Sequence, residues 1–415
     1  MARSLNPVEI RRLLARTLRV GLDGGAPPPQ LLDRWGAARA REASWRAALL
    51  WDGVGAAVGW ALSELDLANL APPDLETAAA EAYEQARAQS VQQTADLVRI
   101  GVEMEGTGVP AIALKGSALL IANLVPALGA RWMSDLDLLV PEHQVEPASR
   151  VLASLDYARG GSRVGAPPLY HPYHDTFTTA DGRAVELHWR LGPARWGPAS
   201  SGADWFARAL PSSAAGIRVP AVADLFWHFL VHDARNHAWS TGSLRAALDL
   251  ALVARAPGFT LAAVVDQLRS DPRPEPLVEA IADAAHLSSV LSAALAPSPQ
   301  PRYLRLAAWR DAIGRRRWRA ERVSEAIAWG ATLDRARRFG GWEGVLDRAL
   351  TIVPEASPGR SLGARMRRAL LTARHAGFVG VLAGAHLLSV PGLGGSADRA
   401  RLAAPAPSPG GGGGR

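Results

Sequence analysis

The sequence contains no cysteine and a single lysine. Without cysteine the chain cannot use thiol catalysis, disulfides or any zinc site that contains cysteine. The single lysine is Lys115, so the other 45 of the 46 basic residues are arginine. A chain so biased towards arginine suggests that position 115 needs a compact, rotatable ammonium that can reach a phosphate, rather than a planar guanidinium. A surface lysine kept by chance is the alternative.

Long apolar runs are also scarce. The longest stretch without a charged residue, from 375 to 397, contains two histidines, several glycines and Pro391. Its continuous apolar part is too short to span a membrane comfortably. Charged residues in the first twelve positions interrupt any secretory signal. We therefore expect a cytoplasmic protein without stable membrane insertion.

The chain is long and apolar enough for more than one folded unit, with 415 residues of which 48% are hydrophobic. Its net charge of +7 favours anionic partners such as nucleotides. The basic run Arg310 to Arg322, interleaved with tryptophan, is compatible with binding to nucleic acid or lipid, but such a run is more often a solvated helix face. We expect the Pro- and Gly-rich tail, residues 403–415, to be disordered.

Hydrophobic spacing divides the chain into regions of different structure. Apolar residues three and four positions apart predict helices before residue 110 and again from residue 224 onward. Between them, short apolar runs at 111–114 and 136–140, and a hairpin signal at Asp181-Gly182, predict strands. We expect an α+β fold in which a small mixed-sheet core is embedded between helical regions. The predicted units are an N-terminal helical region (1–109), the α/β core (110–192), a helical substrate-side region (193–300), a C-terminal helical region (301–402) and the tail (403–415).

The predicted core carries an unusual group of acidic residues. Asp135 and Asp137 are one residue apart on a predicted strand, so both carboxylates face the same side. Glu186, on the second arm of the hairpin, joins them if that arm enters the same sheet. Converging carboxylates select Mg²⁺ or Mn²⁺, and such a site suits two-metal phosphoryl or nucleotidyl transfer. The alternative for the Asp135 pair alone is a solvated strand end.

Several neighbouring residues fit the same chemistry. Gly116 and Ser117 form a turn that lets the backbone approach phosphates. Arg131 could counter triphosphate charge, or equally pair with an acidic side chain at the sheet edge. His188, two residues beyond Glu186, could ligate metal or act as a base, and we expect it to support the metal ligands through a hydrogen bond.

These motifs resemble the nucleotidyltransferase superfamily that includes DNA polymerase β, and are closest to its bacterial branch of uncharacterised nucleotidyltransferases. The resemblance lies in Leu-Lys-Gly-Ser at 114–117, Arg-Trp-Met-Ser-Asp-Leu-Asp at 131–137 and Val-Glu-Leu-His-Trp at 185–189. It implies that Gly116 and Ser117 hold nucleotide phosphates, and that Asp135, Asp137 and Glu186 bind metal. Two features depart from the superfamily pattern: the long interval between Ser117 and Asp135, and a glutamate where aspartate is commoner.

Together these patterns predict an enzyme that uses Mg²⁺ or Mn²⁺ to transfer an NMP from an NTP, such as ATP, to a small-molecule or peptide acceptor. Lys115, Gly116, Ser117 and Arg131 would bind the nucleotide. A non-catalytic nucleotide-sensing or partner-binding module on the same fold remains an alternative, as does a nucleotidyltransferase that modifies nucleic acid.

Two other groups of polar residues suggest different sites. The histidines at 171, 174, 228, 232 and 237 suggest zinc, but they lack the His-Glu-x-x-His spacing, so aromatic packing is the preferred interpretation. Asp224, Arg245 and Asp249 could line an acceptor pocket, although structural pairing of the charges is the better expectation.

Overall fold

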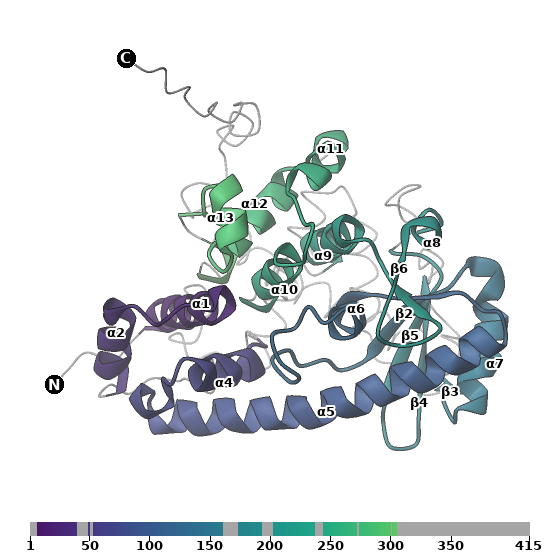
Figure 1. Ribbon diagram of the computed structural model, residues 1–415, viewed down its shortest axis with the longest axis horizontal. Coiled ribbons are helices and arrows are strands. Elements are labelled where there is room, and N and C mark those ends of the chain that lie inside the picture. Colours follow the sequence, from purple (N-terminus) through teal and green to yellow (C-terminus); the bar gives the residue numbers. More distant parts are fainter. Residues whose placement is uncertain are drawn as a thin grey trace, which may run out of the picture.

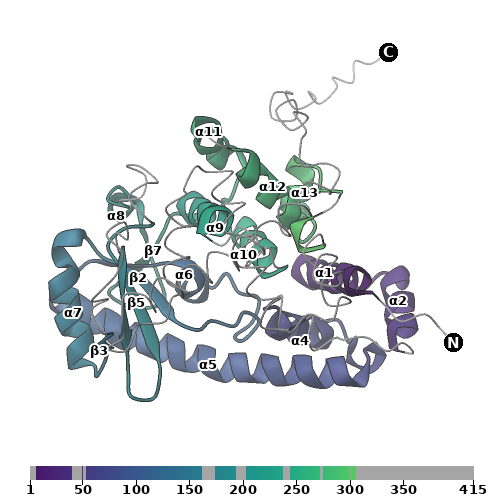
Figure 2. The same ribbon diagram turned by 180° about the vertical axis from the view of Figure 1, so that it is seen from behind.

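The computed structural model describes residues 6–39, 49, 53–160, 173–192, 202–236, 244–271, 274–299 and 301–304. Predictions for the arginine run at 310–322, for the C-terminal helical region and for the tail lie outside these residues, as do those for His171 and His237. Figures 1 and 2 show the described chain from two opposite sides, with a mixed sheet at one end and helices around it.

The N-terminal part is helical, as the spacing predicted, and its first helix has strong local signals. The Asn6 side chain accepts hydrogen bonds from the amides of Val8 and Glu9, while Glu9 accepts one from the Asn6 amide, which forms a capping box. Gly24 ends the helix in the left-handed region, with φ 68°. The helices here are α1 (Pro7–Asp23), α2 (Pro29–Arg39), α4 (Gly55–Glu64) and the short 3₁₀ helix η1 (Ala68–Leu70).

Helix α5 (Pro73–Gly106) has 34 residues and runs beneath the whole molecule, from the N-terminal helices to the sheet (Figure 1). Glycines allow close contacts along it. A β-carbon at Gly59 of α4 would overlap the backbone of Ala79, and one at Gly101 would overlap the carbonyl of Ala215. One long helix therefore joins the N-terminal region to the sheet.

The sheet has seven strands in the order β3-β4-β5-β2-β1-β7-β6. Strand β2 is antiparallel to β1 and parallel to β5, and β1 is parallel to β7, so the sheet is mixed. This confirms the predicted class, a mixed sheet embedded among helices. The strands are β1 (Ala111–Ala113), β2 (Leu136–Leu139), β3 (Ala158–Arg159), β4 (His174–Thr178), β5 (Ala184–His188), β6 (Leu210–Pro211) and β7 (Ile217–Val219).

The hairpin predicted around Asp181-Gly182 is present as β4 and β5, and Gly182 has φ 85° in its turn. Arg183, next to the turn, pairs with Asp96 of α5 at 2.5 Å, which fixes the hairpin to the long helix. Strands β6 and β7 were not predicted, because they are only two and three residues long and lie in the 193–300 unit that was expected to be helical.

Helices lie on both sides of the sheet. Leu136 and Leu138 point into the main hydrophobic core, which also contains residues of α5, of α6 (Lys115–Ile121) and of α7 (Val145–Ser154), the helix after the 3₁₀ turn η2 (Glu142–Gln144). Leu139 instead joins a smaller cluster with Trp205 of α8 (Trp205–Arg208) on the opposite face. Strand alternation thus places Asp137 on the face opposite the main core.

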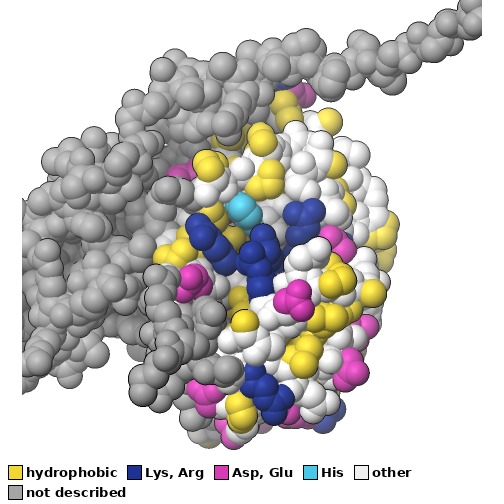
Figure 3. All heavy atoms as spheres, turned by 90° about the vertical axis from the view of Figure 1, so that its left-hand side faces the viewer, with side chains coloured by type: hydrophobic (Ala, Val, Ile, Leu, Met, Phe, Trp, Pro, Cys, Tyr) yellow, Lys and Arg dark blue, Asp and Glu magenta, His cyan; other side chains and the backbone are white. Residues whose placement is uncertain are grey.

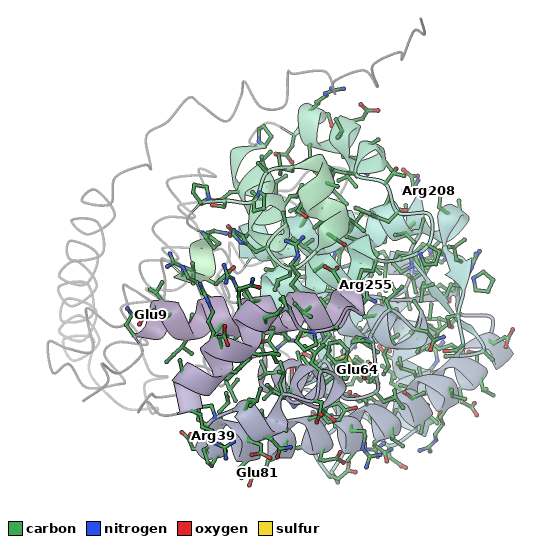
Figure 4. All side chains as sticks on the ribbon, turned by 60° about the vertical axis from the view of Figure 1, so that its left-hand side comes forward. Glu9, Arg39, Glu64, Glu81, Arg208 and Arg255 are labelled. Atoms are coloured by element: carbon green, nitrogen blue, oxygen red, sulfur yellow. The ribbon has the colours of Figure 1, made fainter. Side chains whose placement is uncertain are left out.

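The C-terminal helices that the structure describes are α9 (Val222–Asn236), α10 (Leu244–Ala254), α11 (Ala262–Ser270), α12 (Glu275–Ala284) and α13 (Ser289–Ala294). They pack back onto the N-terminus, where Arg19 donates to Ser292 Oγ at 3.1 Å and Ser289 donates to Asp23 at 2.9 Å. Figure 4 shows α1, which begins near the labelled Glu9, passing between α4 and these helices.

Basic side chains gather on the side of the molecule where α1 and α2 lie (Figure 3). Arg12 and Arg16 of α1 are exposed, and Arg34 of α2 is near enough for its charge to lower the pKa of Arg16, after the larger effect of burial. Among the described residues, no helix is both long and apolar enough to cross a membrane.

Candidate active site

The turn that follows β1 holds the backbone of Asp137 at two points. The Leu114 amide donates to the Asp137 carbonyl at 2.9 Å, and the Asp137 amide donates to Ser117 Oγ at 2.9 Å. Ser117 is fully buried. Its hydroxyl therefore fixes the position of the acidic strand relative to the turn.

Lys115 lies inside this turn in an unusual backbone conformation. Its φ is 46°, in the left-handed region that residues with a β-carbon rarely adopt. The ammonium lies 2.6 Å from Asp137 Oδ1 and 3.4 Å from Glu186 Oε2. A strained backbone at this point directs the chain's single lysine between two carboxylates.

Strand register explains why these side chains meet. Asp137 of β2 is the direct partner of Glu186 in the parallel pair with β5, and Leu139 is the partner of His188. In the antiparallel hairpin, His174 of β4 stands opposite His188. Since alternate residues share a face, Asp137, Glu186, His188 and His174 all lie on the same side of the sheet.

Short distances connect this group. His188 Nε2 lies 3.0 Å from Asp137 Oδ1 and 3.3 Å from Glu186 Oε2, and it is almost completely buried. His174 Nδ1 lies 3.8 Å from Glu186 Oε1, and its ring stacks on that of His188 with centroids 4.9 Å apart. His188 therefore touches both carboxylates directly.

The charges of the group depend strongly on one another. Burial alone would raise the pKa of Asp137, but the Lys115 charge and the hydrogen bond with His188 hold it well below its usual range. Burial would also raise the pKa of Glu186, but the hydrogen bond with His188 and the charge of Lys115 lower it. The pKa of Lys115 is raised because the two carboxylates outweigh the effect of burial. Both acids are thus held as carboxylates beside a cation.

Asp135 comes one residue before β2 and is half-buried. Its carboxylate accepts a hydrogen bond from Ser134 Oγ at 3.0 Å. Burial, and then the negative charges of Asp137 and Glu186, raise its pKa. The charges of both other carboxylates therefore act on Asp135, although this residue precedes the strand on which the sequence placed it.

Arg131 forms a buried ion pair. It donates from Nε and Nη2 to the two oxygens of Asp249 on α10, at 2.6 and 2.9 Å. Of the two interpretations of Arg131, the structure has the pairing with an acidic side chain. A β-carbon at Gly116 would overlap Arg131 Nη1 and Met133 Sδ, so this glycine is needed for packing. The Arg131–Asp249 pair joins the loop before Asp135 to the C-terminal helices.

Residues of the later helices border the same region. Arg245 of α10 lies over the Trp132 ring, at 5.8 Å from its centroid, and is close enough to Asp135 for that charge to act on its pKa, which burial lowers. Asp224 pairs with Arg208 instead of Arg245. His228 packs edge-on against Trp205 at 5.7 Å. Burial lowers the pKa of His228 to about 3, so its ring is neutral.

Sequence reasoning did not place His174 in the acidic site and did not pair Asp249 with Arg131. His174 could have been found by extending the hairpin register from Asp181-Gly182, because that register sets it opposite His188. Asp249 had no such signal, because it pairs with a residue 118 positions away.

Comparison with known proteins identifies a family for this chain. No curated protein matches the chain. Residues 46–287 match a family described as uncharacterised nucleotidyltransferase, a segment that contains the turn, the acidic strand, the hairpin and the helices α9 and α10. Since this match covers more than half of the chain, the protein belongs to the uncharacterised nucleotidyltransferase family.

Proposed function

We propose that this protein transfers an NMP from an NTP to an oxygen nucleophile on a small-molecule or peptide acceptor. The acceptor oxygen forms a bond to the α-phosphorus, the bond from that phosphorus to the pyrophosphate oxygen breaks, and the acceptor loses its proton. The observation that carries the proposal is that Asp137 and Glu186 are direct strand partners and that both of their carboxylates lie next to the Lys115 ammonium.

Asp135, Asp137 and Glu186 are the proposed ligands for Mg²⁺ or Mn²⁺. The Lys115 ammonium, which contacts two of these carboxylates, supports the view that they accept a cation. Asp137 and Glu186 are both held ionised, and oxygen ligands suit these metals. When bound, such metals neutralise charge on the transferring phosphoryl group and activate the attacking oxygen.

The proposed nucleotide-binding residues are Lys115, Gly116, Ser117 and Arg131. Lys115 is the one of them with an accessible charge, because its side chain is 18% exposed whereas that of Arg131 is 6% exposed and bound to Asp249. We assign Lys115 to the triphosphate, and Gly116 and Ser117 to the turn that positions it. Arg131, through its ion pair with Asp249, holds this turn against α10.

His188 is proposed to orient the carboxylates. Its Nε2 lies within 3.3 Å of both Asp137 and Glu186. An imidazole held against both oxygens restricts the rotation of the two carboxylates. His188 would therefore preserve the ligand geometry between turnovers.

The test is transfer of label from NTPs to an extract of metabolites and peptides. The full chain is incubated with each α-³²P-labelled NTP and Mg²⁺ or Mn²⁺, and in parallel with the γ-labelled nucleotide. We expect metal-dependent transfer of the α label only, since the γ-phosphate leaves with pyrophosphate. Transfer of γ label would show a kinase and would refute the proposal.

Two variants make this test specific to the site. The double change Asp135→Asn and Asp137→Asn should abolish transfer, whereas Glu142→Gln should leave it unchanged, because Glu142 is largely exposed and pairs with Arg190 at the surface. Turnover that survives the double change would exclude these residues as metal ligands. Binding of an NTP by wild-type protein without any transfer would instead favour a nucleotide sensor.

A further inference from the structure

The hairpin presents a second set of possible metal ligands that differs in chemistry from the acidic residues. One ligand atom each from His174, Glu186 and His188 lies within 4.8 Å of the other two. Two of the three are imidazoles, whereas Asp135, Asp137 and Glu186 offer only oxygen. Imidazole nitrogen favours zinc and its neighbours in the transition series over Mg²⁺.

The spacing of these atoms suits a small metal ion. Glu186 turns Oε1 towards His174 Nδ1 at 3.8 Å and Oε2 towards His188 Nε2 at 3.3 Å. Around a tetrahedral ion with bonds of about 2.1 Å, neighbouring ligand atoms stand roughly 3.4 Å apart. These two distances involve different oxygens of Glu186, and one ligand atom from each residue lies within 4.8 Å of the other two, so side-chain rotation has to draw the three atoms closer to meet one ion.

Two buried nitrogens of this group lack hydrogen-bond partners among the described residues. His174 Nδ1 is inaccessible to solvent and too far from Glu186 for a hydrogen bond, and His188 Nδ1 is also buried without a partner. Buried polar atoms are almost always satisfied, so an unpaired nitrogen that faces a carboxylate is unusual. A bound cation would satisfy it.

We propose that His174, Glu186 and His188 form a binding site for a divalent transition-metal ion, with Zn²⁺ as its representative. Two histidines and one glutamate form a known set of zinc ligands that leaves a coordination position open. The set lies on two adjacent strands whose register fixes all three side chains on one face. Neither Asp135 nor the nucleotide is needed for this site.

The site would also affect catalysis, because Glu186 belongs to both sets of ligands. An ion held by the hairpin would compete with Mg²⁺ for this carboxylate and would reduce nucleotidyl transfer. This consequence rests on the proposed function, whereas the metal site itself does not.

The experiment measures Zn²⁺ binding to the metal-stripped full chain by isothermal titration calorimetry, without nucleotide. We expect one Zn²⁺ per chain, with affinity reduced at least about tenfold in His174→Gln, because one of three ligands is lost. His143→Gln is the matched control, since His143 is an exposed histidine on η2. Equal affinity in wild type and His174→Gln would overturn the proposal.

Cobalt gives a second measurement on folded wild-type protein, in case His174→Gln does not fold. Co²⁺ bound by two histidines and a carboxylate in a four-coordinate site should show strong visible absorption, displaced by Zn²⁺ but not by Mg²⁺. Absence of that absorption at saturating Co²⁺ would also overturn the proposal. Zn²⁺ binding without α-label transfer would contradict only the proposed enzyme activity.

Discussion

Lys115 and Asp137, 22 residues apart, form an ion pair in which Nζ lies 2.6 Å from Oδ1. The same ammonium reaches Glu186 on the neighbouring strand. Two carboxylates on adjacent strands repel each other unless a cation lies between them. The lysine is therefore the internal counter-ion of this acidic site.

Replacing Lys115 with methionine should destabilise the metal-free protein by about 3 kcal/mol, because it leaves the buried carboxylate of Asp137 and the half-buried one of Glu186 without their counter-ion. Mg²⁺ or Mn²⁺ should restore more of the lost stability in this variant than it adds to wild type. The melting temperature, measured with and without metal, checks both effects.

A second substitution at this position separates charge from shape, and a variant on α5 is its control. Lys115→Arg keeps the charge but replaces a compact ammonium with a planar fork, so we expect weaker nucleotide binding and at least about tenfold lower turnover. Arg87→Met removes an exposed cation on α5 and should change neither property. Equal activity in wild type, Lys115→Arg and Lys115→Met would mean that the lysine has no role in the site.

Much of this arrangement could be predicted from local sequence. The strand at 136–139 and the hairpin were anticipated because alternation and the Asp-Gly turn are short-range signals. Once β2 and β5 are paired, alternation brings Asp137 and Glu186 to one face. Asp135 lies just outside the strand, because regular pairing begins at Leu136.

Contacts between distant parts of the chain could not be predicted in this way. Nothing near Arg131 indicates that its partner is on a helix more than a hundred residues later. Lys115, which the sequence assigned to a phosphate, contacts Asp137 and Glu186 in the fold, and nothing near it in the sequence indicates that pairing. That position depends on a left-handed backbone at residue 115, which no local pattern encodes.

The Arg131–Asp249 pair should be among the most sensitive points for stability. Both side chains are about 6% exposed, so Arg131→Met or Asp249→Asn leaves one partner unpaired and should cost about 3 to 5 kcal/mol. The double variant should cost less than the sum of the two, which urea denaturation of all four proteins can measure. The two-bond pair Arg208–Asp224 is the control, because its arginine is half exposed.

Gly116→Ala should destabilise the same junction. The added methyl would overlap Arg131 Nη1 and Met133 Sδ, and such overpacking costs about 1 to 3 kcal/mol. Gly36→Ala is the matched control, because a β-carbon on that helical glycine meets nothing within 4 Å. There the same change should stabilise slightly, by about 0.5 to 1 kcal/mol. A similar melting temperature for both variants would contradict the packing role of Gly116.

Asp233 of α9 should give the protein an unusual dependence on pH. Burial, and then the negative charge of Asp249, raise the pKa of Asp233 to about 7. In the unfolded chain an aspartate titrates near about 3.9. Between these values the unfolded chain releases a proton that the folded protein keeps, so this residue lowers stability as pH rises from about 4 to 7.

Asp233→Asn should therefore be more stable than wild type at pH 8, by up to about 4 kcal/mol, and equal to it near pH 4. Asparagine keeps the volume of the side chain but has no proton to lose. Melting temperatures at both pH values check this, with Asp266→Asn as the control, because its side chain is 92% exposed. If the difference between wild type and Asp233→Asn is the same at both pH values, folding does not raise the pKa of Asp233.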